Sequence, residues 1–192
     1  GKESAHSRLV DLFCDLLPES RERIRAAGES YAKWWLEEFE PGHDPSEVLG
    51  EVNLFRYRRR GTVLVRTERM THEEAALCLL AARTCGVEVV LSVREDGGLF
   101  SHLAMAAKMG WSHESDKELC QLLRSKDRDL ERIRVLQPSA ELRRAAHDAE
   151  LEVIDWPVLA NGRVELLHYL REQSISETRH RYGNIMAPEE KW

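Results

Sequence analysis

Residues 62–93 decide the fold, and they read TVLVRTERMTHEEAALCLLAARTCGVEVVLSV. The run 62–66 is short and rich in β-branched residues, which is typical of a strand. A capping box at Thr71 opens an alanine- and leucine-rich helix, which we expect to end at Gly86 because glycine suits a left-handed helix cap. Residues 87–93 have the composition of a buried strand. A strand, a helix and a strand within about 30 residues is the length of a right-handed βαβ crossover in a parallel sheet.

The alternation of strands and helices continues toward the C-terminus. We expect helices over residues 99–109, 115–125 and 139–149, and strands over residues 132–136 and 152–156. This alternation favours an α/β fold, a Rossmann-like parallel sheet with flanking helices.

Two segments precede this unit. Residues 3–39 predict two helices interrupted near Pro18, and the prolines and glycine of residues 40–45 mark a boundary after them. Residues 52–57 predict a strand, or the first arm of a hairpin whose polar tip is bounded by Gly61.

The C-terminal segment begins with a helix at Asn161 and Gly162. We expect an apolar stripe to dock this helix on the domain, formed by Val164, Leu166, Leu167 and Leu170. The side chains expected to face water are Glu165, Arg171 and Glu172. Residues 174–182 then favour an extended tail, which either adds backbone hydrogen bonds to a neighbouring sheet edge or frays. We therefore divide the chain into an N-terminal helical segment (1–47), a Rossmann-like α/β domain (48–160) and a C-terminal helix with an extended tail motif (161–192).

Composition narrows the class of protein. A net charge of −6 over 192 residues disfavours nucleic acids and anionic membranes as partners. The arginines of residues 56–60, interleaved with Phe55 and Tyr57, could contact a nucleic-acid strand, but in an acidic chain we favour a polar hairpin tip. Four cysteines without a CxxC pair, and no signal peptide, indicate a reducing, cytoplasmic setting. No apolar run approaches the roughly 20 residues that cross a bilayer, so we do not expect an integral membrane protein.

Catalytic and metal-binding patterns are missing from the sequence. The eight histidines show neither HExxH nor paired Cys/His spacing, so we expect no metal. Cys14, Cys78, Cys85 and Cys120 fall in predicted helices rather than in a glycine-rich loop, and we interpret them as buried structural thiols. No G-x-S-x-G elbow occurs. We therefore assign no catalytic residue.

The turn after the first strand of the crossover argues against a nucleotide. Such a turn normally carries glycines, so that backbone amides can approach a pyrophosphate at the helix N-terminus. Residues 66–71 contain no glycine, and Glu68, Glu73 and Glu74 place negative charge where phosphate would lie. We expect no cofactor in this chain.

Three runs near the C-terminus resemble one enzyme family. They are glycine-arginine-x-glutamate-leucine at 162–166, glutamate-glutamine-serine-x-serine at 172–176 and arginine-tyrosine-glycine at 181–183. They are similar to the C-terminal segment of the bifunctional proline utilization A proteins, which join proline dehydrogenase to L-glutamate-γ-semialdehyde (1-pyrroline-5-carboxylate) dehydrogenase. Residues 76–93 also resemble the cofactor-binding half of aldehyde dehydrogenases, where an apolar strand, an alanine-rich helix, a glycine and a second strand follow in this order.

The resemblance implies an aldehyde-dehydrogenase-like domain without its own active site. The family's lysine-proline-x-glutamate run aligns with residues 92–95, where the lysine is absent, and its oxyanion-binding asparagine would fall within 66–70, where there is none. Such a domain packs on the catalytic aldehyde dehydrogenase domain of the same polypeptide or complex, and its last residues help to cover the tunnel that carries the intermediate. The family's full-length proteins use FAD and NAD. We expect contacts with the catalytic domain from Arg163, Glu165, Arg171, Glu172, Gln173, Arg179, Arg181 and Tyr182.

Two other functions stay open at this point. One is a small NAD(P)-binding oxidoreductase with an atypical phosphate turn, which would hold the ribose hydroxyls with Glu95 or Asp96. The other is a stand-alone interaction adaptor. The abrupt helical start favours a domain cut from a longer protein over a natural short protein.

Overall fold

The computed structural model describes residues 4–44, 51–94, 98–178, 180–181 and 184–185. Its centre is a five-stranded sheet in the order β4-β3-β2-β5-β6, in which every neighbouring pair is parallel. The strands are β2 (Val63–Arg66), β3 (Val89–Val93), β4 (Gly110–His113), β5 (Arg132–Val135) and β6 (Glu152–Ile154). The first of these strands is central and the chain winds outward from it in both directions, as in doubly wound Rossmann-type sheets. The predicted α/β fold is confirmed.

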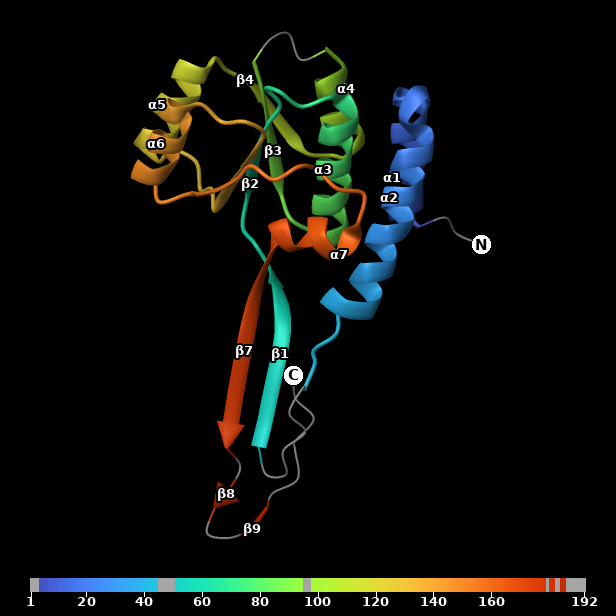
Figure 1. Cartoon of the computed structure of the whole chain (residues 1–192), viewed down its shortest axis with the longest axis vertical. Coiled ribbons are helices and arrows are strands. Elements are labelled where there is room, and N and C mark those ends of the chain that lie inside the picture. Colours follow the sequence, from blue (N-terminus) through green and yellow to red (C-terminus); the bar gives the residue numbers. More distant parts are fainter. Residues whose placement is uncertain (1–3, 45–50, 95–97, 179, 182–183, 186–192) are drawn as a thin grey trace.

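Helices cover both faces of the sheet (Figure 1). On one face lie α3 (His72–Cys85) and α4 (Gly98–Ala106), and on the other lie α5 (Asp116–Ser125) and α6 (Ala140–Asp148). Outside α3 pack α1 (Ala5–Leu16) and α2 (Arg21–Trp34), which are joined by a 3-10 turn (Pro18–Ser20) and followed by a π-helical turn (Trp35–Phe39). Because α3 lies between the sheet and these outer helices, its residues from Ala75 to Ala82 are all buried, which explains their uniformly apolar character.

Local sequence sets the helix ends. Thr71 and Ser115 each form a capping box at the start of α3 and α5, with a glutamate three residues later. Gly86 ends α3 with φ of 67°, a backbone conformation that glycine adopts without steric cost.

Two long antiparallel strands, β1 (Glu51–Arg59) and β7 (Leu170–Thr178), form a ribbon that extends away from the body (Figure 1). We call this ribbon the arm. The hairpin expected around Gly61 is wrong, because β1 pairs with β7 and not with the strand that follows Gly61. The chain instead passes from the arm into the sheet there. A short antiparallel pair, β8 (His180–Arg181) and β9 (Asn184–Ile185), follows β7.

The helix expected after Asn161 is shorter than predicted and presents different residues to the core. It consists of α7 (Gly162–Glu165) and a 3-10 turn (Leu166–Tyr169), after which β7 begins. Val164 and Leu167 are 41% and 38% exposed, whereas Glu165 is completely buried. Leu166 and Leu170, the other two residues of the expected stripe, are buried as predicted. The tighter 3-10 turn changes the angle between successive side chains, so Leu167 does not share their face.

Candidate functional site

The carboxyl end of the parallel sheet is the first candidate site. Open α/β sheets bind ligands beyond the carboxyl ends of their strands, at the point where neighbouring strands send the chain to opposite faces. Here that point lies between β2 and β5. β2 ends there at Arg66, whose side chain is completely buried.

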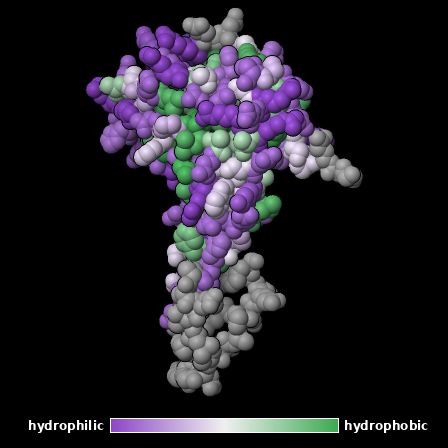
Figure 2. Space-filling model, turned by 45° about the vertical axis from the view of Figure 1, so that its right-hand side comes forward, coloured by the Kyte–Doolittle hydropathy of each residue, from purple (hydrophilic) through white to green (hydrophobic). Residues whose placement is uncertain are grey.

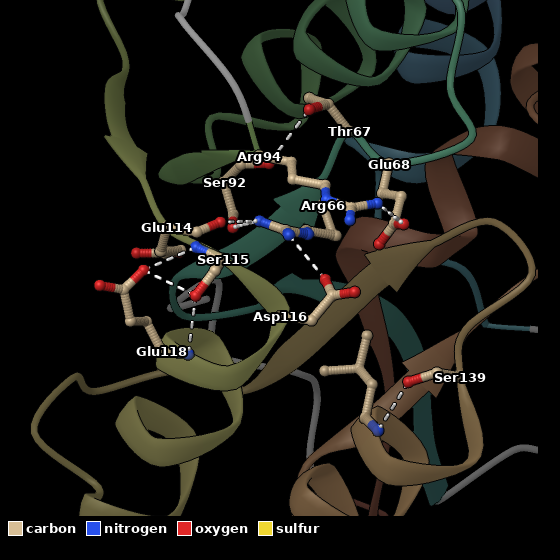
Figure 3. Close-up of polar contacts among 11 residues, drawn as sticks. Arg66, Thr67, Glu68, Ser92, Arg94, Glu114, Ser115, Asp116, Glu118 and Ser139 are labelled. Atoms are coloured by element: carbon tan, nitrogen blue, oxygen red, sulfur yellow. Dashed lines mark hydrogen bonds and ion pairs between the residues drawn. The ribbon is translucent and has the colours of Figure 1, made fainter.

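Arg66 makes a hydrogen-bond network with β3, with the loop after β4 and with the start of α5. Its Nη1 donates to Ser92 Oγ at 2.9 Å and to the Glu114 carbonyl oxygen at 2.8 Å, and its Nη2 donates to Asp116 Oδ1 at 2.7 Å (Figure 3). Burial of Asp116 opposes ionisation, but the hydrogen bond and charge of Arg66 outweigh it, so the pKa of Asp116 lies below its ordinary value. The arginine is held by its own chain at the place where a ligand would approach.

The helices α3, α5 and α6 begin at this end of the sheet, and each N-terminus is capped from within the chain. Thr71 and Ser115 act in capping boxes, and Ser139 Oγ accepts from the Leu142 amide at 3.1 Å. Each helix also carries a glutamate in its first turn. A helix N-terminus attracts phosphate through unpaired N–H groups and the positive end of its dipole. The caps occupy part of these donors, and the carboxylates oppose a bound anion.

The turn between β2 and α3 contains no glycine, and an arginine takes its left-handed backbone position. Its Arg69 has φ of 68°, and its Glu68 accepts from Arg94 Nη1 at 2.8 Å. Glu95 and Asp96, the candidate ribose ligands, lie outside the described residues.

Among the described residues, this end of the sheet gathers neither a thiolate nor metal ligands. All four cysteines are buried and free. Burial raises the pKa of Cys78 to about 12, which disfavours the thiolate that a nucleophile requires. Within the described ranges, no three histidine, cysteine or carboxylate side chains come together in a way that could hold a metal ion.

The root of the arm is the second candidate site, and a buried ion pair lies at its centre. Both carboxylate oxygens of Glu165 accept from Arg134 Nη2 at 3.3 Å, and Glu165 Oε2 also accepts from the Leu159 amide at 2.9 Å. Arg134 further donates to the carbonyl oxygens of Trp156 and Pro157. The pair thus joins β5, the loop after β6 and α7.

Two more arginines hold the start of β7. Arg132 Nη1 donates to the His168 carbonyl at 2.6 Å, and Arg60 Nε donates to the Leu170 carbonyl at 3.2 Å. Burial, together with the positive charges of Arg134 and Arg132, lowers the pKa of His168 from 6.5 to about 4. The arm is therefore anchored through its backbone to the body.

Close packing requires the glycine that opens α7. A Cβ at Gly162 would lie 2.7 Å from the Ser30 carbonyl oxygen and 2.9 Å from the Tyr31 Cα. The next residue, Arg163, places its guanidinium 5.2 Å from the ring centroid of Trp34. The glycine-arginine-x-glutamate run therefore docks α7 on α2.

The fold and these two sites can be compared with known proteins. No protein-family model matches the chain, and no curated protein matches it. Among solved structures, proline utilization A from Corynebacterium freiburgense superposes with a TM-score of 0.55 and 26% identity, over 88% of this chain and 15% of that one. Proline utilization A from Bdellovibrio bacteriovorus gives 0.54 and 16%, over 77% of this chain and 19% of that one. A NAD-dependent benzaldehyde dehydrogenase from Corynebacterium glutamicum gives 0.53 and 14%, over 81% and 42%.

The chain has an aldehyde-dehydrogenase-like fold. It spans only 15% and 19% of the two proline utilization A proteins and 42% of the benzaldehyde dehydrogenase. The likeness therefore concerns one part of each of those proteins.

The residues that we expected to contact a partner differ in how far their side chains are exposed. Exposed side chains belong to Arg163, Arg171 and Glu172. Gln173 is half-buried and its Oε1 accepts from Arg56 Nε at 2.8 Å. Glu165 is completely buried against Arg134, so in this structure its side chain serves the interior of the domain.

The remaining contact candidates lie beyond the end of β7. Arg179 and Tyr182 lie outside the described residues, and Arg181 is described only as a backbone position in β8. Figure 2 shows the molecule narrowing from the body into the arm, and the coloured surface of the arm in this view is mainly hydrophilic. Within the described segments, no helix has the length and apolar character needed to cross a membrane.

Sequence reasoning missed the three buried arginines Arg66, Arg132 and Arg134. A signal for two of them was available. Residues 132–135 read Arg-Ile-Arg-Val, so both arginines share one face of a strand that has neighbours on both sides. Interior strands of parallel sheets are normally apolar on both faces, so paired arginines on such a strand indicate buried partners.

Proposed function

We propose that this chain is a noncatalytic assembly domain of a bifunctional proline-catabolic enzyme, which converts proline to glutamate through 1-pyrroline-5-carboxylate in the cytoplasm. In this proposal the domain packs on an aldehyde dehydrogenase catalytic domain and helps to enclose the tunnel between the active sites. The observation that carries the proposal is an aldehyde-dehydrogenase-like fold in which Arg66, at the carboxyl end of β2, is buried and bonded to its own chain.

Two further features support this role. The arm projects from the body as an antiparallel ribbon, and an isolated two-stranded ribbon is at best marginally stable in water. Three arginines at the root of the arm, Arg60, Arg132 and Arg134, hold it in one orientation, so the arm can offer a preformed surface. The similarity of residues 162–176 to proline utilization A proteins gives the partner its proposed identity.

Calorimetric titration with NAD⁺ tests the absence of a cofactor site. We expect heats equal to those of dilution, because Arg66 is held by its own chain and the N-termini of α3, α5 and α6 are capped. Binding at micromolar strength, about −8 kcal/mol, would favour the alternative of a small NAD(P)-dependent oxidoreductase.

Sedimentation of the chain with a proline utilization A dehydrogenase domain tests the assembly role. Association with that domain supports the proposal. Association with an unrelated protein and none with the dehydrogenase would instead favour a stand-alone adaptor. In a parent protein, deletion of residues 162–192 should slow the coupled conversion of proline to glutamate, and unchanged flux with unchanged assembly would contradict the proposal.

A further inference from the structure

A cavity of about 360 Å³ opens at one end of the packed helices α1, α2 and α3. Gly28 brings α1 and α2 close together, because a Cβ there would lie 2.6 Å from Val10 Cγ2. His6 Nε2 donates to the Gly28 carbonyl oxygen at 2.9 Å, and α1 begins only one residue before His6. The helix α2 therefore continues past the start of α1 (Figure 1), and the small side chain of Ala32 leaves space between them.

The walls of this cavity are held together by the chain itself. His6 joins all three helices, because its Nε2 donates to α2 and its Nδ1 lies 3.4 Å from Thr84 Oγ1 on α3. Thr84 Oγ1 in turn donates to the Leu80 carbonyl oxygen at 2.8 Å. Small-molecule pockets are usually preformed and measure about 300–1,000 Å³, so the cavity has the size and the fixed walls of a small-ligand site.

The lining of the cavity is mainly apolar and includes an unusual backbone turn. Leu9, Ala32, Trp35 and Leu36 all contribute to it. Trp35 begins the π-helical turn that follows α2. Such turns are rare and are frequently found at functional sites. Leu36, in the same turn, is 64% exposed, so an apolar ligand group in the cavity would remove part of its surface from water.

Arg83 gives the cavity a positive charge. It lies in the last turn of α3, its side chain is exposed, and it makes no ion pair or side-chain hydrogen bond with another described residue. None of the described residues that line the cavity is a carboxylate. A negatively charged ligand group would therefore meet one cation without a competing partner. A single arginine suits a carboxylate better than a phosphate, which is usually bound by a cluster of arginines.

We propose that this cavity binds a small apolar carboxylate, whose hydrocarbon chain packs against Trp35 and Leu36 and whose carboxylate pairs with Arg83. The cavity lies at the C-terminal end of α3, whereas the carboxyl end of the sheet lies at the start of that helix. The site is therefore separate from the position where a nucleotide would approach. The inference goes beyond the proposed assembly role and does not depend on it.

Titration of the full chain with octanoate, and with its uncharged analogue octanamide, tests the proposal by nuclear magnetic resonance. We expect octanoate to shift the indole N–H signal of Trp35 and the amide signals of Leu36 and Thr84. Octanoate should bind about fivefold more tightly than octanamide, because only octanoate can pair with Arg83.

Three variants separate the charge from the apolar contact. Arg83→Gln should abolish the preference for octanoate and leave the affinity for octanamide unchanged. The matched control Arg144→Gln alters an exposed arginine on α6 that makes no ion pair with a described residue, and it should leave the preference unchanged. Leu36→Ser should weaken the binding of both compounds, because it removes apolar surface from the rim.

Several results would overturn the proposal. If octanoate at millimolar concentration shifts none of these signals, or shifts signals of another region instead, the cavity is not its site. Equal affinities for octanoate and octanamide, or an unchanged preference in Arg83→Gln, would refute the ion pair. Equal shifts with acetate, which lacks the hydrocarbon chain, would refute the apolar contact. Association with the dehydrogenase domain is measured separately by sedimentation, so failure of this inference and failure of the proposed function are distinguishable.

Discussion

Replacing Glu165 by leucine removes one half of a buried ion pair and should destabilise the whole domain. The side chains of Glu165 and Arg134 are 0% and 1% exposed, so water cannot replace the lost carboxylate. The guanidinium keeps its carbonyl acceptors but loses its counter-charge, and the Leu159 amide loses its acceptor. Breaking a buried pair in this way typically costs about 3–5 kcal/mol. For a chain of this length each kcal/mol lowers Tm by about 2–4 °C, so we expect a decrease of about 6–20 °C.

The assay is urea unfolding followed by tryptophan fluorescence and circular dichroism. Arg134→Met should cost a similar amount, but the double variant should cost much less than the sum, because it leaves no uncompensated charge. The control Asp11→Asn breaks an exposed pair with Arg25 and should cost less than about 1 kcal/mol. A loss below about 1 kcal/mol for Glu165→Leu, or additive costs in the cycle, would refute the reasoning.

Three further predictions use the same unfolding assay or a thiol reagent. Gly162→Ala should cost about 1–3 kcal/mol because its Cβ would overlap backbone atoms, whereas Gly110→Ala should cost little, since its nearest contact would be 3.9 Å away. His168 titrates near 6.5 when unfolded and near 4 when folded, so protonation of the unfolded state should reduce stability as pH falls through that window. Partial exposure of the ring limits this loss to about 1–2 kcal/mol, and His168→Gln should abolish it; an unchanged pH profile would show that His168 is not responsible. Cys78 and the other three thiols are buried, so a thiol reagent should label them only after urea is added, and rapid labelling of the native chain would contradict their burial.

Local sequence was sufficient for the central crossover and its helix ends. The β-branched run, the capping box at Thr71 and the glycine at position 86 act within a few residues of one another, so their meaning does not depend on the rest of the chain. The same holds for the capping box at Ser115. β4 was not predicted, because Gly110–His113 is a short edge strand whose residues are mostly exposed and carry no apolar periodicity.

Contacts distant in sequence decided the rest. β1 finds its partner more than a hundred residues later, and nothing in residues 51–59 distinguishes that pairing from a local hairpin. Glu165 carries the polarity of a surface residue, and only the position of Arg134 on the neighbouring face of β5 makes its burial favourable. The sequence by itself determined the central crossover and the capped starts of α3 and α5, because those signals are local. The tertiary structure decided which strand edges pair and which charges lie inside, because both depend on groups that folding alone brings together.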